Sequence, residues 1–258
     1  MKKYLIVYLL FAFQCIYADL WMPDSEDERL ELERKTLFIS LGSSCVPAGI
    51  LRVSGLRSVA FPLDWLLSLD NQGLIKAIQD GFENLINDDF LIPDNFLIPK
   101  DWGASLIHVG YHFEFVHEGD FFGAESEKNM QRLIEKYQRR IERFRKLDEY
   151  SGTIVFVRSC YSSGLTDPHR YFKCEEIIDI SDEDSLNLYW ALKNRFPNTK
   201  IKLVILNEGD PLDKVVVEKV LNDDLIKIRH GFQPAEFTKI AQFILLFSNE
   251  IGHSELEG

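Results

Sequence analysis

The sequence predicts an α/β fold with a mostly parallel sheet, flanking helices and a large aromatic-rich insertion after the first βα unit. Short, nearly continuous apolar segments with β-branched residues are typical of strands that are buried on both faces of a sheet. Four such segments lie at residues 36–41, 153–157, 201–206 and 225–228. Helical patterns follow at residues 125–147, 181–196 and 234–247. Strands that alternate with helices favour βαβ units and therefore parallel pairing.

Residues 58–123 interrupt this alternation. They contain three prolines, many aromatic side chains and a hairpin pattern near 107–116. We interpret the segment as an insertion folded over the end of the sheet, within a single α/β domain of residues 36–250. A charged lead-in (19–35) precedes this domain, and a polar tail (251–258) follows it.

Residues 1–18 have the pattern of a signal peptide. Lys2 and Lys3 form a basic start, residues 4–13 are apolar, and Ala18 is the small residue that a cleavage site needs. A membrane span needs about 20 apolar residues, so this run predicts export to a periplasmic or secreted location without stable membrane insertion after cleavage. An uncleaved anchor is the alternative.

The composition excludes two classes of partner. The chain of 258 residues has a formal net charge of −12, and no Lys/Arg cluster stands out. Nucleic acids and anionic membrane surfaces require concentrated positive charge, so neither is expected to bind. The hydrophobic content of 46% is enough for a sizeable core.

Cysteine usage leaves two redox states open. Removal of the signal peptide would leave Cys45, Cys160 and Cys174, an odd number. A bridge between Cys160 and Cys174 would leave Cys45 as the unpaired thiol. In a reducing compartment, all three would be thiols.

Polar and reactive side chains follow the predicted strands where each strand ends. They are Cys45 after the first, Arg158 after the second, Asn207 after the third and His230 after the fourth. The carboxyl ends of parallel strands meet at one edge, where ligands of open α/β sheets bind. Strand ends are also polar simply because loops begin there.

Cys45 has the most favourable local chemistry of these residues. Pro47 suits the first turn of a helix and Gly55 its end, which places Cys45 at the helix N-terminus. The N–H groups and dipole of a helix start favour a thiolate over a thiol and can bind an oxyanion. A buried cysteine that acts as a small hydrophobe is the structural alternative.

Several short motifs around Cys45 resemble the opening signature of a known family. They are Ser-Leu-Gly-Ser-Ser-Cys at 40–45, Leu-Arg at 51–52, Gly-Leu-Arg at 55–57 and Phe-Pro-Leu-Asp-Trp at 61–65. The pattern is similar to that of a bacterial domain-of-unknown-function family described as "putative papain-like cysteine peptidases". Leu63 departs from it, because phenylalanine is usual there. A looser similarity continues through His117-Glu118 to the strand that contains Arg158.

The resemblance implies a cysteine-dependent hydrolase that needs no cofactor and acts on a peptide or small acyl substrate. Cys45 would be the nucleophile and His117 the base, with Asp64 or Glu118 orienting the imidazole. Papain-like folds pair a helical half with an antiparallel barrel, whereas the strand pattern here predicts a parallel sheet.

Other interpretations remain open from the residues alone. His230 is the rival base, because it ends a predicted strand. An esterase-like site would use Ser44 as nucleophile with Asn207 as an oxyanion donor. A non-catalytic module would bind its ligand in an aromatic groove with Arg158. No metal site is expected, because His112 and His117 would face opposite sides of a regular strand.

Overall fold

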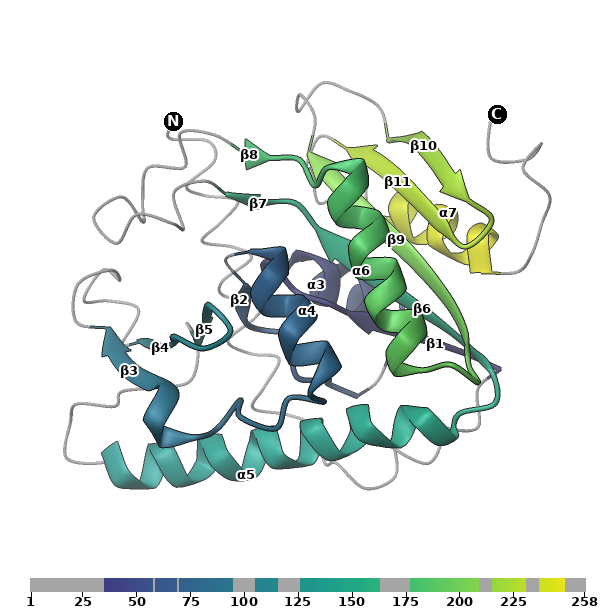
Figure 1. The fold of residues 1–258 in the computed structure, drawn as a ribbon. Helices are drawn as coiled ribbons and strands as arrows, with labels where there is room; N and C mark the ends of the chain where they lie inside the picture. Colours follow the sequence, from purple (N-terminus) through teal and green to yellow (C-terminus); the bar gives the residue numbers. More distant parts are fainter. Residues whose placement is uncertain are drawn as a thin grey trace.

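The computed structural model of the chain describes residues 35–57, 59–68, 70–94, 105–115, 126–162, 177–208, 215–230 and 237–248. Five strands of the described chain form the central sheet (Figure 1), in the order β1-β6-β9-β11-β10. They are β1 (Thr36–Ser40), β6 (Thr153–Ser159), β9 (Lys200–Glu208), β11 (Leu225–His230) and β10 (Val216–Asn222). The first four are parallel, and β10 pairs antiparallel with β11. The mainly parallel α/β fold is therefore confirmed.

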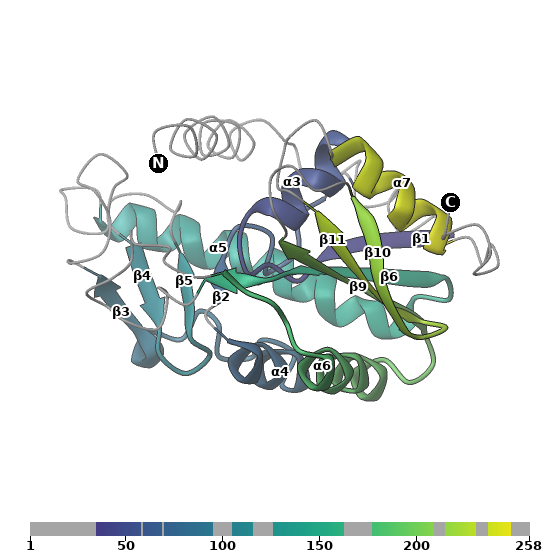
Figure 2. The same cartoon turned by 90° about the horizontal axis from the view of Figure 1, so that it is seen from above.

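Helices cover both faces of this sheet, because its parallel strands carry apolar side chains on both sides. One face packs on α4 (Asn71–Gln79), α5 (Ser126–Arg145) and α6 (Asp182–Arg195). The other face packs on α3 (Val46–Val53) and α7 (Phe237–Ser248). Figure 2 shows α3 and α7 on one side of the sheet and α4 and α6 on the other. Successive strand residues alternate between the two cores; for example, Ile154 and Phe156 face one and Val155 and Val157 the other.

A second sheet is built from residues 67–115. It is antiparallel, with the order β2-β5-β4-β3. Its strands are β2 (Leu67–Ser68), β5 (Phe113–Phe115), β4 (Ser105–His108) and β3 (Leu91–Asp94). The hairpin expected near 107–116 is formed by β4 and β5. The aromatic-rich cover of the sheet end stays a prediction, because residues 95–104 and 116–125 lie outside the described parts of the chain.

Shorter elements complete the described structure. They are the 3-10 turns η1 (Asp88–Phe90) and η3 (Lys146–Glu149), and a two-stranded sheet of β7 (Tyr161–Ser162) and β8 (Ile177–Ile178). Helix α6 begins within one residue of the predicted start at 181: the Ser181 side chain accepts a hydrogen bond from the Asp184 N–H, and three acidic residues fill the first turn.

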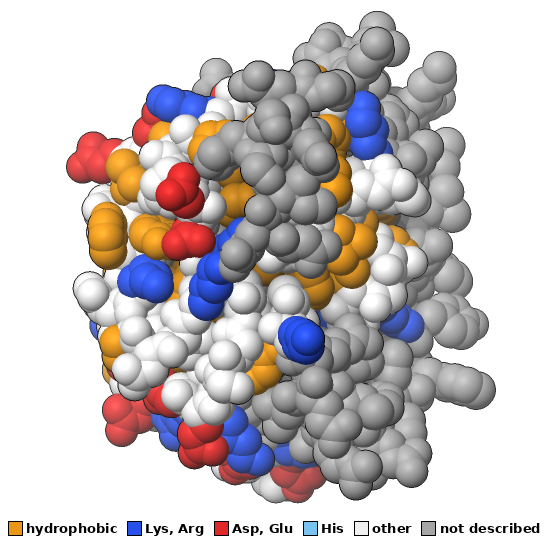
Figure 3. All heavy atoms as spheres, turned by 90° about the vertical axis from the view of Figure 1, so that its right-hand side faces the viewer, with side chains coloured by type: hydrophobic (Ala, Val, Ile, Leu, Met, Phe, Trp, Pro, Cys, Tyr) orange, Lys and Arg blue, Asp and Glu red, His pale blue; other side chains and the backbone are white. Residues whose placement is uncertain are grey.

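Strand β10 ends the sheet on the side opposite β1. The face of the molecule at the right of Figure 1, where β10 and α7 lie, carries hydrophobic side chains interspersed with charged ones (Figure 3). The exposed hydrophobic residues of these two elements include Val216 and Val220 of β10. The register of β10 with β11 shifts at two places along the strand. Such irregularities protect an edge strand against pairing with other chains.

No helix among the described residues is long and apolar enough to cross a membrane. The predicted signal peptide (1–18), nearly all of the lead-in and the polar tail lie outside the described residues, so the export prediction stays open.

Candidate functional site

The register of the central sheet brings the carboxyl ends of four parallel strands to one edge, which we call the carboxyl edge. Ser40 of β1 is opposite Val157 of β6, and Ser159 is opposite Leu206 of β9. Asn207 is in turn opposite Arg229 of β11. The segments that follow these strands, including the one that contains Cys45, therefore start at this edge.

Residues 42–45, which we call the Cys45 turn, connect β1 to α3 through an uncommon backbone. Gly42 (φ +67°) and Ser43 (φ +80°) are both left-handed, and Cys45 is the residue before the first turn of α3. Pro47 lies in that first turn and Gly55 (φ +65°) follows the helix end, as the sequence predicts. The half-buried Cys45 side chain packs against the core beneath α3 and α7.

Gly42 is required because another backbone segment lies directly against it. A Cβ at this position would lie 2.7 Å from the Leu63 carbonyl oxygen and 3.2 Å from that of Leu66. Leu63 belongs to the Phe-Pro-Leu-Asp-Trp motif, and Leu66 directly follows it. Two of the motifs that carry the family resemblance, at 40–45 and 61–65, are therefore in contact.

Two serine hydroxyls attach the Cys45 turn to the end of β6. The Ser43 hydroxyl donates to the carbonyl of Cys160, and Ser44 Oγ lies 3.4 Å from Ser159 Oγ. Ser44 Oγ also accepts a hydrogen bond from the N–H of Val46 (3.3 Å). The hydroxyl predicted as an alternative nucleophile thus contributes to the start of α3.

Asp64 forms a buried ion pair with Arg57, another residue of the signature. Arg57 Nη1 lies 2.6 Å from Asp64 Oδ2, and the exposed fractions of the two side chains are 4% and 0%. Asp64 Oδ2 also accepts from the Phe61 N–H (2.8 Å), and Arg57 donates to the Ala48 carbonyl of α3. These contacts join the 61–65 segment to α3.

Arg158 is fully buried and points toward the second sheet. Its Nη1 donates to the Leu41 carbonyl (2.8 Å) and to Ser68 Oγ of β2. Ser68 Oγ in turn accepts a hydrogen bond from the Ser43 N–H (3.0 Å). The residue predicted to bind a ligand therefore lies behind the Cys45 turn, where it links both sheets.

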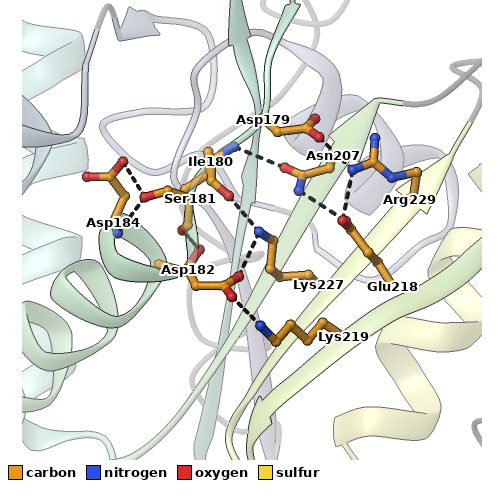
Figure 4. Close-up of polar contacts among 11 residues, drawn as sticks. Asp179, Ile180, Ser181, Asp182, Asp184, Asn207, Glu218, Lys219, Lys227 and Arg229 are labelled. Atoms are coloured by element: carbon orange, nitrogen blue, oxygen red, sulfur yellow. Dashed lines mark hydrogen bonds and ion pairs between the residues drawn. The ribbon is translucent and has the colours of Figure 1, made fainter.

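The Asn207 side chain belongs to a polar network at the ends of β9, β10 and β11 (Figure 4). Its Oδ1 accepts from the Ile180 N–H (3.2 Å), and its Nδ2 donates to Glu218 Oε2 (3.1 Å). Arg229 pairs with both Asp179 and Glu218, which hold the pKa of the arginine above its usual value. The Asn207 amide thus connects β9 to β10 and to the segment before α6.

His230 lies on the same face of the sheet as Cys45. The alternation along β11 directs it to the side of Ile226 and Ile228, which pack beneath α3 and α7. It is 1% exposed, and burial lowers its pKa to about 4, so the imidazole is neutral at pH 7. Strands β6 and β9 lie between β1 and β11.

The described structure also contains a histidine that a carboxylate orients. His112 Nδ1 lies 2.5 Å from Asp70 Oδ2, and Asp70 Oδ1 accepts from the Gly73 N–H at the start of α4. His112 has a left-handed backbone (φ +54°) in the turn between β4 and β5. Sequence reasoning missed this pair, because 42 positions separate its two members and no periodic pattern relates them.

His108 has a structural environment. Its Nε2 donates to the Asn84 carbonyl, its Nδ1 accepts from the Tyr111 N–H, and its ring stacks on the Tyr111 ring. Burial lowers the pKa of His108. Both His117 and Glu118 lie outside the described residues, so their predicted roles stay predictions. No group of metal-binding side chains occurs in the part of the chain that the structure describes.

Comparisons with known proteins place this site in a family. An uncharacterized protein of Acanthamoeba polyphaga mimivirus (R408) is 27% identical over 183 residues, which cover 63% of this chain and 80% of the viral protein. No solved structure matches the chain significantly. A sequence profile of the family described as "Putative papain-like cysteine peptidase (DUF1796)" matches residues 36–169, more than half of the chain. The chain that carries the Cys45 turn, its buried Arg57–Asp64 pair and Arg158 therefore belongs to this family.

Proposed function

We propose that the protein is a cysteine-dependent hydrolase in which Cys45 is the nucleophile. The observation that carries the proposal is the position of Cys45, at the start of α3 after two left-handed residues and at the carboxyl edge of a parallel sheet. Strained backbone conformations are concentrated at functional sites, and helix starts lower the pKa of a thiol. Membership of the peptidase-described family agrees with this chemistry.

The proposed reaction is acyl transfer through a thioester. The Cys45 thiolate attacks the carbonyl carbon of the substrate, and the bond to the amine or alcohol leaving group breaks as a histidine protonates that group. Water, deprotonated by the same histidine, then attacks the thioester, and the carboxylic acid product leaves with regeneration of the thiolate. The N–H groups at the start of α3 are candidates for binding the oxyanion.

The base in this proposal is His117, with Glu118 or Asp64 as its orienting group. His117 follows β5 by two residues, and β5 pairs with β2, whose Ser68 contacts the Cys45 turn. His230 is the alternative base, and unlike His117 it is among the residues that the structure describes. Its lowered pKa makes it a weaker proton acceptor than an ordinary histidine. Asp64 is already paired with Arg57, which favours Glu118 as the orienting group.

The proposed substrates are peptides or small acyl compounds outside the cytoplasm. The export part of the proposal rests on the predicted signal peptide, and the substrate class rests on the family description.

Labelling and activity together test the proposal. Iodoacetamide should alkylate Cys45 near neutral pH faster than Cys160 and Cys174 after reduction, as measured by peptide mass spectrometry. A panel of fluorogenic peptides and activated esters should then be hydrolysed by the wild type and by Cys160→Ser, but not by Cys45→Ala. Equal labelling of the three thiols, or hydrolysis that survives Cys45→Ala, would contradict the proposal.

A further inference from the structure

Hydrogen bonds connect one buried residue of the Cys45 turn to two buried side chains behind the turn. Ser43, Ser68 and Arg158 come from the turn itself, from β2 and from β6, and their exposed fractions are 2%, 0% and 0%. Ser68 Oγ lies at the centre of the group, because it accepts hydrogen bonds from both the Ser43 N–H and Arg158 Nη1. The second sheet thus contacts the turn through the Ser68 hydroxyl.

The turn needs such support because of its backbone. Ser43 has a left-handed conformation (φ +80°), which is unfavourable for a residue other than glycine. Conformations of this kind persist only where surrounding contacts maintain them. The N–H of Ser43 is held by Ser68, its hydroxyl donates to the Cys160 carbonyl, and Arg158 holds the preceding Leu41 carbonyl.

We propose that Ser68 and Arg158 are positioning residues for the Cys45 thiol. This inference rests on the proposed role of Cys45 as nucleophile. Arg158 fixes the Ser68 hydroxyl, and Ser68 fixes the left-handed Ser43. Ser43 in turn sets the direction in which the chain enters α3, and therefore where Cys45 lies relative to the N–H groups of the helix start. Neither side chain needs to touch the substrate for this role.

The test is the pH dependence of Cys45 alkylation in the full chain. Ser68→Ala removes the acceptor for both hydrogen bonds while leaving the volume of the side chain almost unchanged. It should raise the apparent pKa of Cys45 by about one unit and slow labelling by up to about tenfold at pH values below that pKa, because a smaller fraction of the thiol is ionised. Ser68→Thr, which keeps the hydroxyl, should restore the rate. Arg158→Lys should act in the same direction as Ser68→Ala.

Ser185→Ala is the matched control. Ser185 is also fully buried, and its hydroxyl donates to the carbonyl of Ser181, the cap residue of α6, a helix on the face of the sheet opposite α3. It should change thermal stability about as much as Ser68→Ala without changing the labelling profile of Cys45.

The outcomes separate this inference from the proposed function. A reactive Cys45 in the wild type whose profile is unchanged in Ser68→Ala, or equally changed in Ser185→Ala, would overturn the positioning role alone. An ordinary, slowly labelled Cys45 in the wild type would overturn both proposals.

Discussion

The Arg57 guanidinium lies 2.6 Å from the Asp64 carboxylate in an interior that excludes both groups from solvent. Because Arg57 also donates to the Ala48 carbonyl, the pair fastens the Phe-Pro-Leu-Asp-Trp segment to the helix that Cys45 precedes. Two motifs that are separate in the sequence thus form one structural unit. In such a unit, a residue can be needed for activity without taking part in the chemistry.

Replacement of Asp64 should be costly for stability. Asp64→Asn leaves the Arg57 charge buried without its carboxylate partner, and loss of one member of a buried pair costs about 3–5 kcal/mol. Urea unfolding monitored by circular dichroism measures this loss of unfolding free energy. Asp148→Asn is the control, because it breaks the more exposed pair with Arg195 and should cost about 0.2–1 kcal/mol. A small effect of Asp64→Asn on stability together with complete loss of hydrolysis would instead support the orienting role.

Alanine at Gly42 and at Gly55 should have different consequences. Both glycines are left-handed, but a Cβ at Gly42 meets the Leu63 carbonyl whereas nothing lies within 4 Å of one at Gly55. Gly55→Ala should therefore lower the free energy of unfolding only by the cost of a left-handed non-glycine residue, about 1–2 kcal/mol. Gly42→Ala should lower the free energy of unfolding by more, because its Cβ also meets the Leu63 carbonyl, and it should slow alkylation of Cys45. Equal unfolding free energies for the two variants would contradict the close contact.

His230 should make the fold sensitive to acid. Burial keeps its imidazole neutral down to about pH 4, while in the unfolded chain it is protonated below about pH 6.5. The unfolded state therefore binds more protons in this window, and stability falls as the pH decreases from about 6.5 to 4, by up to about 3 kcal/mol. The pKa of His108 is lowered too and contributes in the same direction.

Unfolding free energies measured across this window test the assignment. His230→Gln should flatten the pH dependence relative to the wild type. His112→Gln, which changes an exposed imidazole, should leave the contribution of His230 in place. If His230→Gln does not change the slope of the unfolding free energy against pH, another group causes the acid sensitivity.

Three histidine variants should identify the base. General acid–base catalysis contributes about 10²–10⁴-fold, so His117→Gln should lower kcat by that order if His117 is the base. His230→Gln and His112→Gln should then retain most of the activity. A loss confined to His230→Gln would transfer the role to the end of β11, and a loss confined to His112→Gln would transfer it to the Asp70-oriented imidazole.

The parallel strands and helices α5, α6 and α7 were predictable because their apolar residues are continuous or have helical spacing. Strand β10 was not, because most of its side chains are exposed or half-buried and its sequence contains Glu218 and Lys219. Strand β2 consists of two residues, too few to give a periodic signal, although it supplies Ser68. Cys45 was recognised from its neighbours Gly42 and Pro47. The contacts around it were not, because they join residues as far as 117 positions apart.

Strand β1, which leads into Cys45, pairs within the described sheet with β6 alone. A strand with a single neighbour separates from its sheet at a lower free energy than a strand with two. Local opening of β1 would therefore expose the thiol while β6, β9 and β11 stay folded. Reagents could reach Cys45 by this route as well, and its labelling rate would then rise with the fraction of molecules in which β1 is open. Amide hydrogens of β1 would exchange earlier than those of β9, so that the proposed nucleophile would follow one of the first parts of the central sheet to loosen.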